Sequence, residues 1–259
     1  MSQYREAVES ADGTRIVFHS RGDGPALVIV PGALVTLDFY FQLAELLAPA
    51  YRVLVVERRE YGESGNGPRP AEFTAQAADL AAVLATLDDH AFVFGHSAGG
   101  LVALHALHRD QSMVRGLALY EPPVSLAGPP LTSTLATIRD HMAASRPADA
   151  IIEFFTAIVE PTPPRAALQP LADALTFRAS GLVADLECLT AMNADITPWS
   201  AIDVPALLLA GGLTDPYGTE SVELLQATLP DARTITLPGQ FHHPHDAAVV
   251  AAALREFFV

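Results

Sequence analysis

The sequence contains no lysine, and this absence removes several kinds of chemistry. All fifteen basic residues are arginine. Without lysine the chain cannot form a Schiff base, build a serine-lysine dyad or complete a phosphate-binding loop of the Walker type. Thirty acidic residues give a formal net charge of -15, which repels nucleic acids and anionic membrane surfaces. We therefore expect neither of these as a partner.

Cysteine is almost absent as well, since Cys188 is the single one. One cysteine can form no internal disulfide and no thiolate metal cluster, and an unpaired cysteine usually packs as a small apolar residue. The first ten residues show no basic segment followed by an apolar one, and no apolar run approaches the about 20 residues that span a membrane. We expect a cytoplasmic protein.

What the chain does contain is a regular alternation of strand and helix patterns. Half of the 259 residues are apolar, which is enough for a large core. Residues 4 to 20 predict an antiparallel hairpin at a sheet edge. Continuous apolar runs then alternate with segments of helical periodicity, and they predict buried strands at 26–30, 51–56, 91–94, 114–120, 206–210 and 233–237. This order indicates an α/β fold with a doubly wound, mostly parallel sheet.

The alternation stops after Glu121 and resumes at residue 206. Residues 122–198, called the cap segment below, hold ten of the twenty prolines and short helical patterns such as 150–159 and 182–189. We predict a helical cap, or lid, inserted into a core domain made of residues 1–121 and 199–259. An ordinary set of helices covering one face of the sheet is the alternative.

The most informative motif is Gly95-His96-Ser97-Ala98-Gly99, which joins a predicted strand to a predicted helix over residues 101–107. A serine on such a sharp turn needs small residues two positions before and after it, or the turn cannot close. The helix behind it directs its positive end and free N–H groups toward an oxyanion. The motif therefore predicts a nucleophile elbow that carries Ser97.

Two candidate partners for Ser97 follow predicted strands at the carboxyl edge of the sheet, where ligands bind in open α/β folds. Asp215 comes after the strand at 206–210, and His242 comes after the strand at 233–237. Serine, acid and histidine in this order are expected when the nucleophile sits on an elbow. A neutral imidazole would take the proton of the hydroxyl, and a buried carboxylate would orient that imidazole.

These motifs resemble the α/β-hydrolase fold superfamily along essentially the whole chain. The matching residues are Gly95 to Gly99, Pro31-Gly32-Ala33, the loop from Glu57 to Ser64, Thr214-Asp215-Pro216 and Gly239 to His242. The resemblance implies a catalytic triad with Ser97 as nucleophile, Asp215 as acid and His242 as base. It also implies an oxyanion hole formed by the N–H groups of Ala33 and Ala98.

The chain departs from the usual family pattern at three places. Pro31 stands where members often have a histidine that helps to hold the oxyanion loop. Glu57 and Glu60 stand where an aspartate and a glycine are usual, and Phe241 precedes the catalytic histidine in place of a small residue. No catalytic group is lost.

Several assignments have alternatives. His243 could be the base in place of His242, and Glu121 could replace Asp215 as the orienting acid or else line the pocket. A metal site could be built from His242, His243, His245 and Asp246, but we predict no metal. Further candidates for the substrate pocket are Phe154, Phe155 and Trp199.

The preferred hypothesis is a serine esterase that hydrolyses an ester, thioester or lactone through an acyl-enzyme, without a cofactor. The expected partner is a small, apolar, neutral substrate, and homodimerisation is left open. The alternatives are a carbon-carbon bond hydrolase, a perhydrolase or a lyase with the same triad, or a non-catalytic small-molecule-binding protein that keeps the fold.

Overall fold

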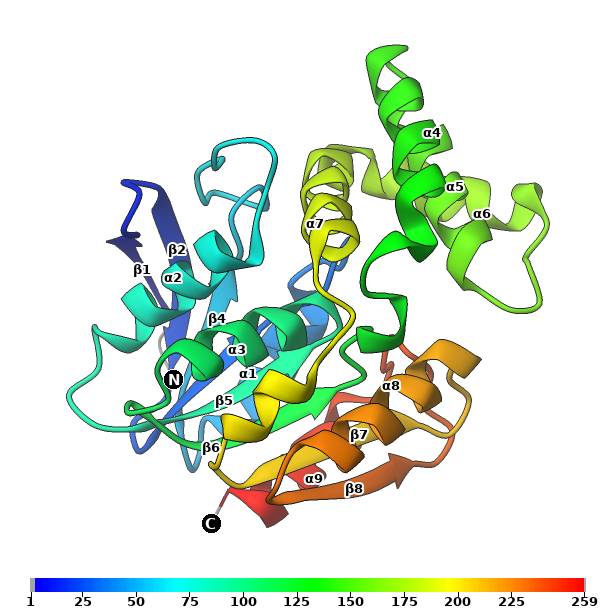
Figure 1. The fold of residues 1–259 in the computed structure, drawn as a ribbon. Helices are drawn as coiled ribbons and strands as arrows, with labels where there is room; N and C mark the ends of the chain where they lie inside the picture. Colours follow the sequence, from blue (N-terminus) through cyan, green and yellow to red (C-terminus); the bar gives the residue numbers. More distant parts are fainter. Residues whose placement is uncertain (1–2, 259) are drawn as a thin grey trace.

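Eight strands form one sheet in the order β1-β2-β4-β3-β5-β6-β7-β8 in the computed structural model, which describes residues 3–258 (Figure 1). Strands β1 and β2 are antiparallel to each other, and β2 is antiparallel to β4. From β4 onward all neighbours are parallel. The strands are β1 (Gln3–Glu9), β2 (Arg15–Arg21), β3 (Ala26–Val30), β4 (Arg52–Glu57), β5 (Ala91–His96), β6 (Val114–Tyr120), β7 (Ala206–Gly211) and β8 (Ala232–Leu237). The predicted α/β class and mostly parallel sheet are confirmed.

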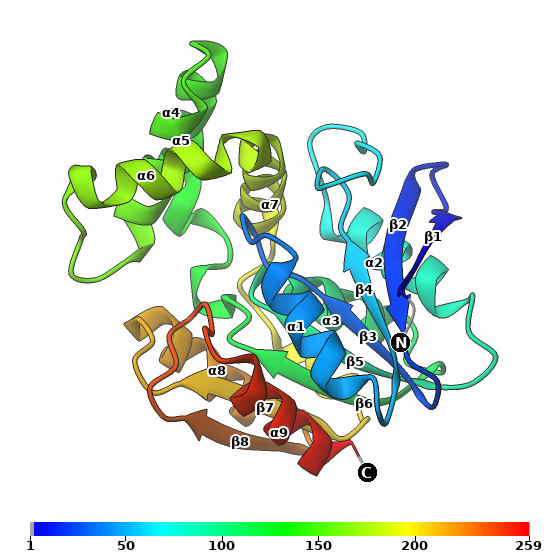
Figure 2. The same ribbon diagram turned by 180° about the vertical axis from the view of Figure 1, so that it is seen from behind.

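Helices cover both faces of this sheet. On one face α1 (Asp38–Leu47) packs beside α9 (Ala247–Phe257), as the view from behind shows (Figure 2). On the other face lie α2 (Phe73–Leu84), α3 (Ala98–Arg109) and α8 (Pro216–Thr228). In β3, Leu27 and Ile29 join the core of the first face, while Val28 and Val30 join that of the second. Burial on both sides explains why this strand is a continuous apolar run.

The cap segment leaves the sheet after β6 and returns to it at β7. Helices α4, α5 and α6 project away from the sheet, whereas α7 stands between them and the loop after β4 (Figure 1). The helices of this segment are η1 (Val124–Leu126), η2 (Pro129–Leu131), α4 (Thr132–Ala143), α5 (Pro147–Ile158), α6 (Arg165–Leu175), η3 (Thr176–Arg178), α7 (Ala179–Ala191) and η4 (Thr197–Ala201), the last of which crosses its end. The sequence pattern at 182–189 falls within α7, and the pattern at 150–159 falls within α5 except for its last residue, because α5 ends at Ile158.

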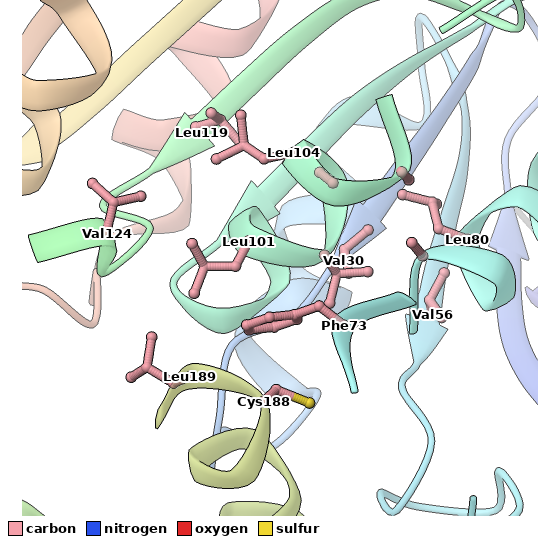
Figure 3. Close-up of a cluster of buried hydrophobic side chains, with 14 of the residues drawn as sticks. Val30, Val56, Phe73, Leu80, Leu101, Leu104, Leu119, Val124, Cys188 and Leu189 are labelled. Atoms are coloured by element: carbon pink, nitrogen blue, oxygen red, sulfur yellow. The ribbon is translucent and has the colours of Figure 1, made fainter. Parts of the chain in front are cut away.

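One helix of the cap segment is anchored in the core of the sheet. Figure 3 shows Cys188 and Leu189 of α7 beside Phe73 of α2 and Leu101 of α3. Cys188 is buried, as its isolation in the sequence predicted. Burial raises the pKa of its thiol to about 12, so the thiol stays protonated and unreactive at neutral pH.

No helix within residues 3–258 is both long enough and apolar enough to cross a lipid bilayer.

Candidate active site

Ser97 occupies the turn between β5 and α3 in a backbone conformation that ordinary residues avoid. Its φ is 51° and its ψ is -124°. A Cβ atom on Gly99 would come within 2.1 Å of the Val30 carbonyl oxygen, and one on Gly95 within 2.6 Å of the Gly100 Cα. Only glycine fits at either position. The turn has the geometry of a nucleophile elbow, with the serine at the carboxyl edge of the sheet.

The imidazole of His242 lies next to this serine. Its Nε2 is 3.0 Å from the Ser97 Oγ. His242 follows β8 in a loop that is fixed from below, because the Tyr120 hydroxyl donates to the Phe241 carbonyl over 2.7 Å and the His96 Nε2 contacts the His242 carbonyl at 2.9 Å. The structure thus joins the predicted nucleophile to the predicted base.

The neighbouring polar residues of this loop have other contacts. The ring of His243 stacks on that of His96, with 5.7 Å between the centroids, and no hydrogen bond links His243 to Ser97. The carboxylate of Asp246 accepts hydrogen bonds from the Ala248 and Val249 N–H groups and thereby caps α9. Across the described part of the chain, no group of three or more histidine, cysteine, aspartate or glutamate side chains is arranged to hold a metal ion.

The carboxylate that contacts His242 belongs to Glu121, not to Asp215. The Glu121 Oε2 lies 2.7 Å from the His242 Nδ1. Because an ionised carboxylate can only accept, the Nδ1 must carry the proton, and the Nε2 is left free to accept one from Ser97. Glu121 is fully buried, and it also accepts from the Gly211 N–H and the Thr214 hydroxyl, both over 2.6 Å.

Asp215 lies at the start of α8 and is turned toward the cap segment. Its Oδ1 accepts a hydrogen bond of 2.9 Å from the Glu160 N–H, just beyond the end of α5. The expected contact between Asp215 and His242 is therefore wrong. The physical reason lies in the backbone directly after β6, the strand that pairs with the strand before Ser97. Glu121 has a φ of 44°, and in this left-handed conformation its side chain reaches the imidazole of His242.

The loop after β3 passes directly over the elbow. A Cβ on Gly32 would lie 3.1 Å from the Cβ of Ser97. This loop contains Ala33, and the N-terminus of α3 begins with Ala98, whose N–H has no partner within its own helix. The two predicted oxyanion donors thus lie in the segments that flank Ser97, and their role stays a prediction.

His96 and Tyr40 link this loop to the histidine, and the sequence had given neither a role. The Gly32 N–H donates to the Tyr40 hydroxyl over 3.1 Å, and that hydroxyl lies 2.6 Å from the His96 Nδ1. Burial, together with the nearby His242 and His243, holds the pKa of His96 well below its usual value, so its ring is neutral. A neutral ring accepts from Tyr40 at Nδ1 and donates from Nε2 to the His242 carbonyl. The only sequence feature that could have indicated this role was the position of His96 directly before Ser97.

The backbone at position 60 explains why family members usually have a glycine where this chain has Glu60. Glu60 has a φ of 70°, in the left-handed region where glycine costs least. Its carboxylate accepts from the Gly67 N–H over 3.0 Å and pairs with Arg69. Glu57, where aspartate is usual, lies 2.6 Å from the His19 Nε2 and accepts from the Glu63 N–H. Both replacements keep the loop fixed beside the site.

A cavity of about 400 Å³ opens at Ser97 and His242. Its lining contains no Asp, Glu or Arg side chain, and apart from Ser97, Thr36, Tyr217 and three histidines it is apolar. Phe154 and Phe155 line it, as predicted.

Two other predicted pocket residues do not line this cavity. Trp199 is only 4% exposed and packs edge-on against the ring of His105, with 5.6 Å between the centroids, because η4 folds back onto α3. Glu121 lies behind His242 and is shielded from the cavity by the imidazole.

Comparison with known proteins agrees with this fold. Residues 27–253 match the model of the alpha/beta hydrolase family. A pimeloyl-[acyl-carrier protein] methyl ester esterase from Xanthomonas axonopodis pv. citri is 27% identical over 253 residues, which are 91% of this chain and 96% of that protein. An esterase of the same name from Vibrio campbellii is 36% identical over 111 residues, which span only 42% of each chain.

Among solved structures, an alpha/beta hydrolase from Sphaerobacter thermophilus superposes with a TM-score of 0.86. It is 32% identical in sequence, and the match covers 98% of this chain and 100% of that one. Since the family model spans most of the sequence, the chain belongs to the alpha/beta hydrolase family and is a hydrolase.

Proposed function

We propose that the protein is a serine esterase with Ser97 as nucleophile, His242 as base and Glu121 as the orienting acid. One observation carries the proposal: His242 bridges the two other groups, with 3.0 Å from its Nε2 to the Ser97 Oγ and 2.7 Å from its Nδ1 to the Glu121 Oε2. Both distances are those of hydrogen bonds, and the tautomer that Glu121 imposes leaves the Nε2 as a proton acceptor.

The reaction follows from this arrangement. His242 takes the Ser97 proton while the Oγ attacks the carbonyl carbon, and the Ala33 and Ala98 N–H groups stabilise the negative oxygen that forms. The protonated imidazole then gives its proton to the leaving alcohol or thiol, which leaves an acyl-serine. A water molecule, deprotonated by His242, attacks the acyl carbon, so that the carboxylic acid departs and Ser97 recovers its proton. Glu121 stabilises the imidazolium in both halves, and no cofactor is required.

The cavity supports an apolar, neutral acyl group as substrate. Phe154, Phe155 and Ile158 come from one face of α5, and no charged carboxylate or guanidinium faces them across the lining. An apolar acyl group would bind by burial, at about 25 cal/mol for each Å² removed from water. The cap segment carries four arginines and eight acidic residues, and this balance disfavours an anionic carrier such as coenzyme A.

We infer further that residues 122–198 act as the cap of a core formed by residues 1–121 and 199–259. The lining of the cavity supports this, since it combines Ser97 and His242 of the core with α5 and α6 of the cap segment. The cytoplasmic location, the absence of nucleic-acid and membrane partners, and the oligomeric state stay predictions from the sequence.

The proposal is tested by covalent labelling and by a substrate panel. A fluorophosphonate probe is expected to modify the wild type at Ser97, identified by peptide mass spectrometry, and to leave Ser97→Ala unlabelled. A panel of chromogenic esters, thioesters and lactones of increasing acyl length then gives kcat/KM for each class. A folded wild type that neither reacts with the probe nor hydrolyses any member of the panel would instead support the binding-protein alternative.

A further inference from the structure

The loop that follows β3 and carries Ala33, called the oxyanion loop here, is held in place by a hydrogen bond to the backbone carbonyl of Pro31. Pro31 has no N–H and no polar side chain, so it cannot anchor the loop by itself. Its carbonyl oxygen accepts a hydrogen bond of 2.8 Å from the Nε of Arg58, a buried residue directly after the end of β4. Three residues further on, Leu34 has a φ of 57°, and its N–H makes a long contact of 3.5 Å with the Tyr61 hydroxyl.

Both of these supports converge on one carboxylate of the cap segment. Asp185 of α7 forms a two-pronged ion pair with Arg58, with 2.6 Å from Nη1 to Oδ1 and 2.8 Å from Nη2 to Oδ2. The Tyr61 hydroxyl donates to the same Oδ2 over 2.7 Å. Asp185 therefore fixes the two side chains that hold Pro31 and Leu34 on either side of Ala33.

The burial of this cluster makes its geometry stiff. The side chains of Arg58 and Asp185 are 3% and 6% exposed. Burial by itself lowers the pKa of a guanidinium, yet Asp185 raises that of Arg58 above its ordinary value. Burial also raises the pKa of Tyr61 well above its usual value, so its hydroxyl keeps the proton that it donates. The helix lies so close to Tyr61 that a Cβ on Gly181 would clash with the tyrosine ring, so this position has room only for glycine.

We propose that Asp185 is a positioning residue through which the cap segment sets the geometry of the oxyanion hole. It acts on Ala33 through Arg58 and Tyr61 and does not touch the substrate. The proposal rests on the function proposed above, since it assumes that the Ala33 N–H binds the oxyanion. Its consequence is that α7 does more than cover the site: an enzyme whose α7 has moved away lacks a properly formed oxyanion hole.

The same helix provides a matched control. Glu187, two residues from Asp185, is also buried and also ties α7 to the core, because it pairs with Arg69 at 2.9 Å and accepts from the Ala71 N–H over 2.9 Å. It has no hydrogen bond with the oxyanion loop within residues 3–258. Glu187→Gln should therefore lower stability without changing the chemistry.

The experiment compares Asp185→Asn and Glu187→Gln with the wild type. For Asp185→Asn we expect kcat on a short neutral ester to fall about 10- to 100-fold while KM changes less than about threefold, since a misplaced oxyanion donor acts on the transition state. The inhibition constant of a trifluoromethyl ketone, which forms the tetrahedral adduct, should rise in proportion. Glu187→Gln should leave both within about threefold. Equal losses in the two variants would overturn the proposal.

Two further measurements cover failure of folding and failure of the proposed function. Arg58→Lys keeps the buried charge balanced but cannot reach Pro31 and both oxygens of Asp185 together, so it should reproduce the loss of kcat in a folded protein. If it does not, the proposal is wrong. Hydrogen exchange at residues 32–36 requires no turnover: it should quicken in Asp185→Asn and not in Glu187→Gln. Exchange that is the same in both variants refutes the coupling even if the protein hydrolyses no ester, and only absent labelling at Ser97 counts against the proposed function.

Discussion

The carboxyl ends of β6 and β7 each carry an acid that could serve His242, and only one of them contacts it. Glu121 is fully buried and accepts three hydrogen bonds, whereas Asp215 is partly exposed and accepts one from the main chain of Glu160. A buried carboxylate surrounded by donors interacts strongly with an imidazolium, because little water screens it. The comparison teaches that a sequence motif can predict the edge of the sheet at which an acid lies without deciding which of two neighbouring strands brings its acid into contact with the histidine.

The largest effect should come from removing His242, which Glu121 contacts and Asp215 does not. His242→Ala is expected to lower kcat/KM by about 10⁴- to 10⁶-fold, since the members of a triad act as a unit. His243→Ala removes a ring that stacks on His96 and lines the cavity but has no hydrogen bond with Ser97, so it should cost less than about tenfold. Steady-state kinetics on one chromogenic ester would measure both. The reverse order would mean that the base is the next residue in the loop.

The second prediction opposes the two acids directly. Glu121→Gln should lower kcat by about 10³- to 10⁴-fold, because an amide can hold the imidazole in the wrong tautomer and cannot stabilise its charge. Asp215→Asn should change kcat less than about threefold, since the amide oxygen still accepts from Glu160. Circular dichroism would confirm that both variants fold. A severe loss in Asp215→Asn alongside an active Glu121→Gln would return the catalytic role to Asp215.

A third, intermediate effect concerns the acyl side of the site. Phe155→Ala enlarges the cavity and removes apolar contacts from α5, so kcat/KM for long acyl esters should fall about 10- to 100-fold while acetyl esters change little. The ratio of the two rates is the measurement. Equal losses on both substrates would show that the acyl chain lies elsewhere.

The smallest expected effect tests what Asp215 does in place of catalysis. Its contact with Glu160 fixes the chain just after Ile158, the last residue of α5, which lines the cavity. Asp215→Ala removes the acceptor and should lower the preference for long over short acyl esters by about two- to fivefold. Asp215→Asn, which keeps an acceptor, is the control. An unchanged preference in Asp215→Ala would reduce the contact to a surface hydrogen bond.

The sequence predicted the sheet, the elbow and the histidine because each depends on local rules. Apolar runs specify buried strands, and Gly95 and Gly99 are required by a turn that permits no Cβ. The sequence favoured Asp215 and kept Glu121 as the alternative, because both acids are followed by proline and both come soon after a strand. The contact with His242 depends on the left-handed backbone angle of Glu121, and no sequence pattern predicts that angle for a glutamate.

The supports of the oxyanion loop could not be predicted for a different reason. Arg58 and Asp185 lie 127 positions apart in the chain, and their pairing depends on where α7 docks. Trp199 was assigned to the pocket because it is aromatic and lies near the end of the cap segment. The same sequence is equally compatible with its burial against His105, because an aromatic ring can pack either in a core or in the wall of an apolar pocket.

Four residues with side chains hold positive φ angles in the loops at the carboxyl end of the sheet, and three of them, Leu34, Ser97 and Glu121, belong to the segments that build the candidate site; the fourth is Glu60 in the loop after β4. Each such angle costs about 1–3 kcal/mol, which is a sizeable share of the stability of an ordinary domain. A library selected only for survival of heating should therefore accumulate glycine at 34 and 121, and those survivors should be poor hydrolases. The same few backbone angles lower the stability of this protein and position its catalytic groups, so selection for resistance to heat should act against catalytic activity.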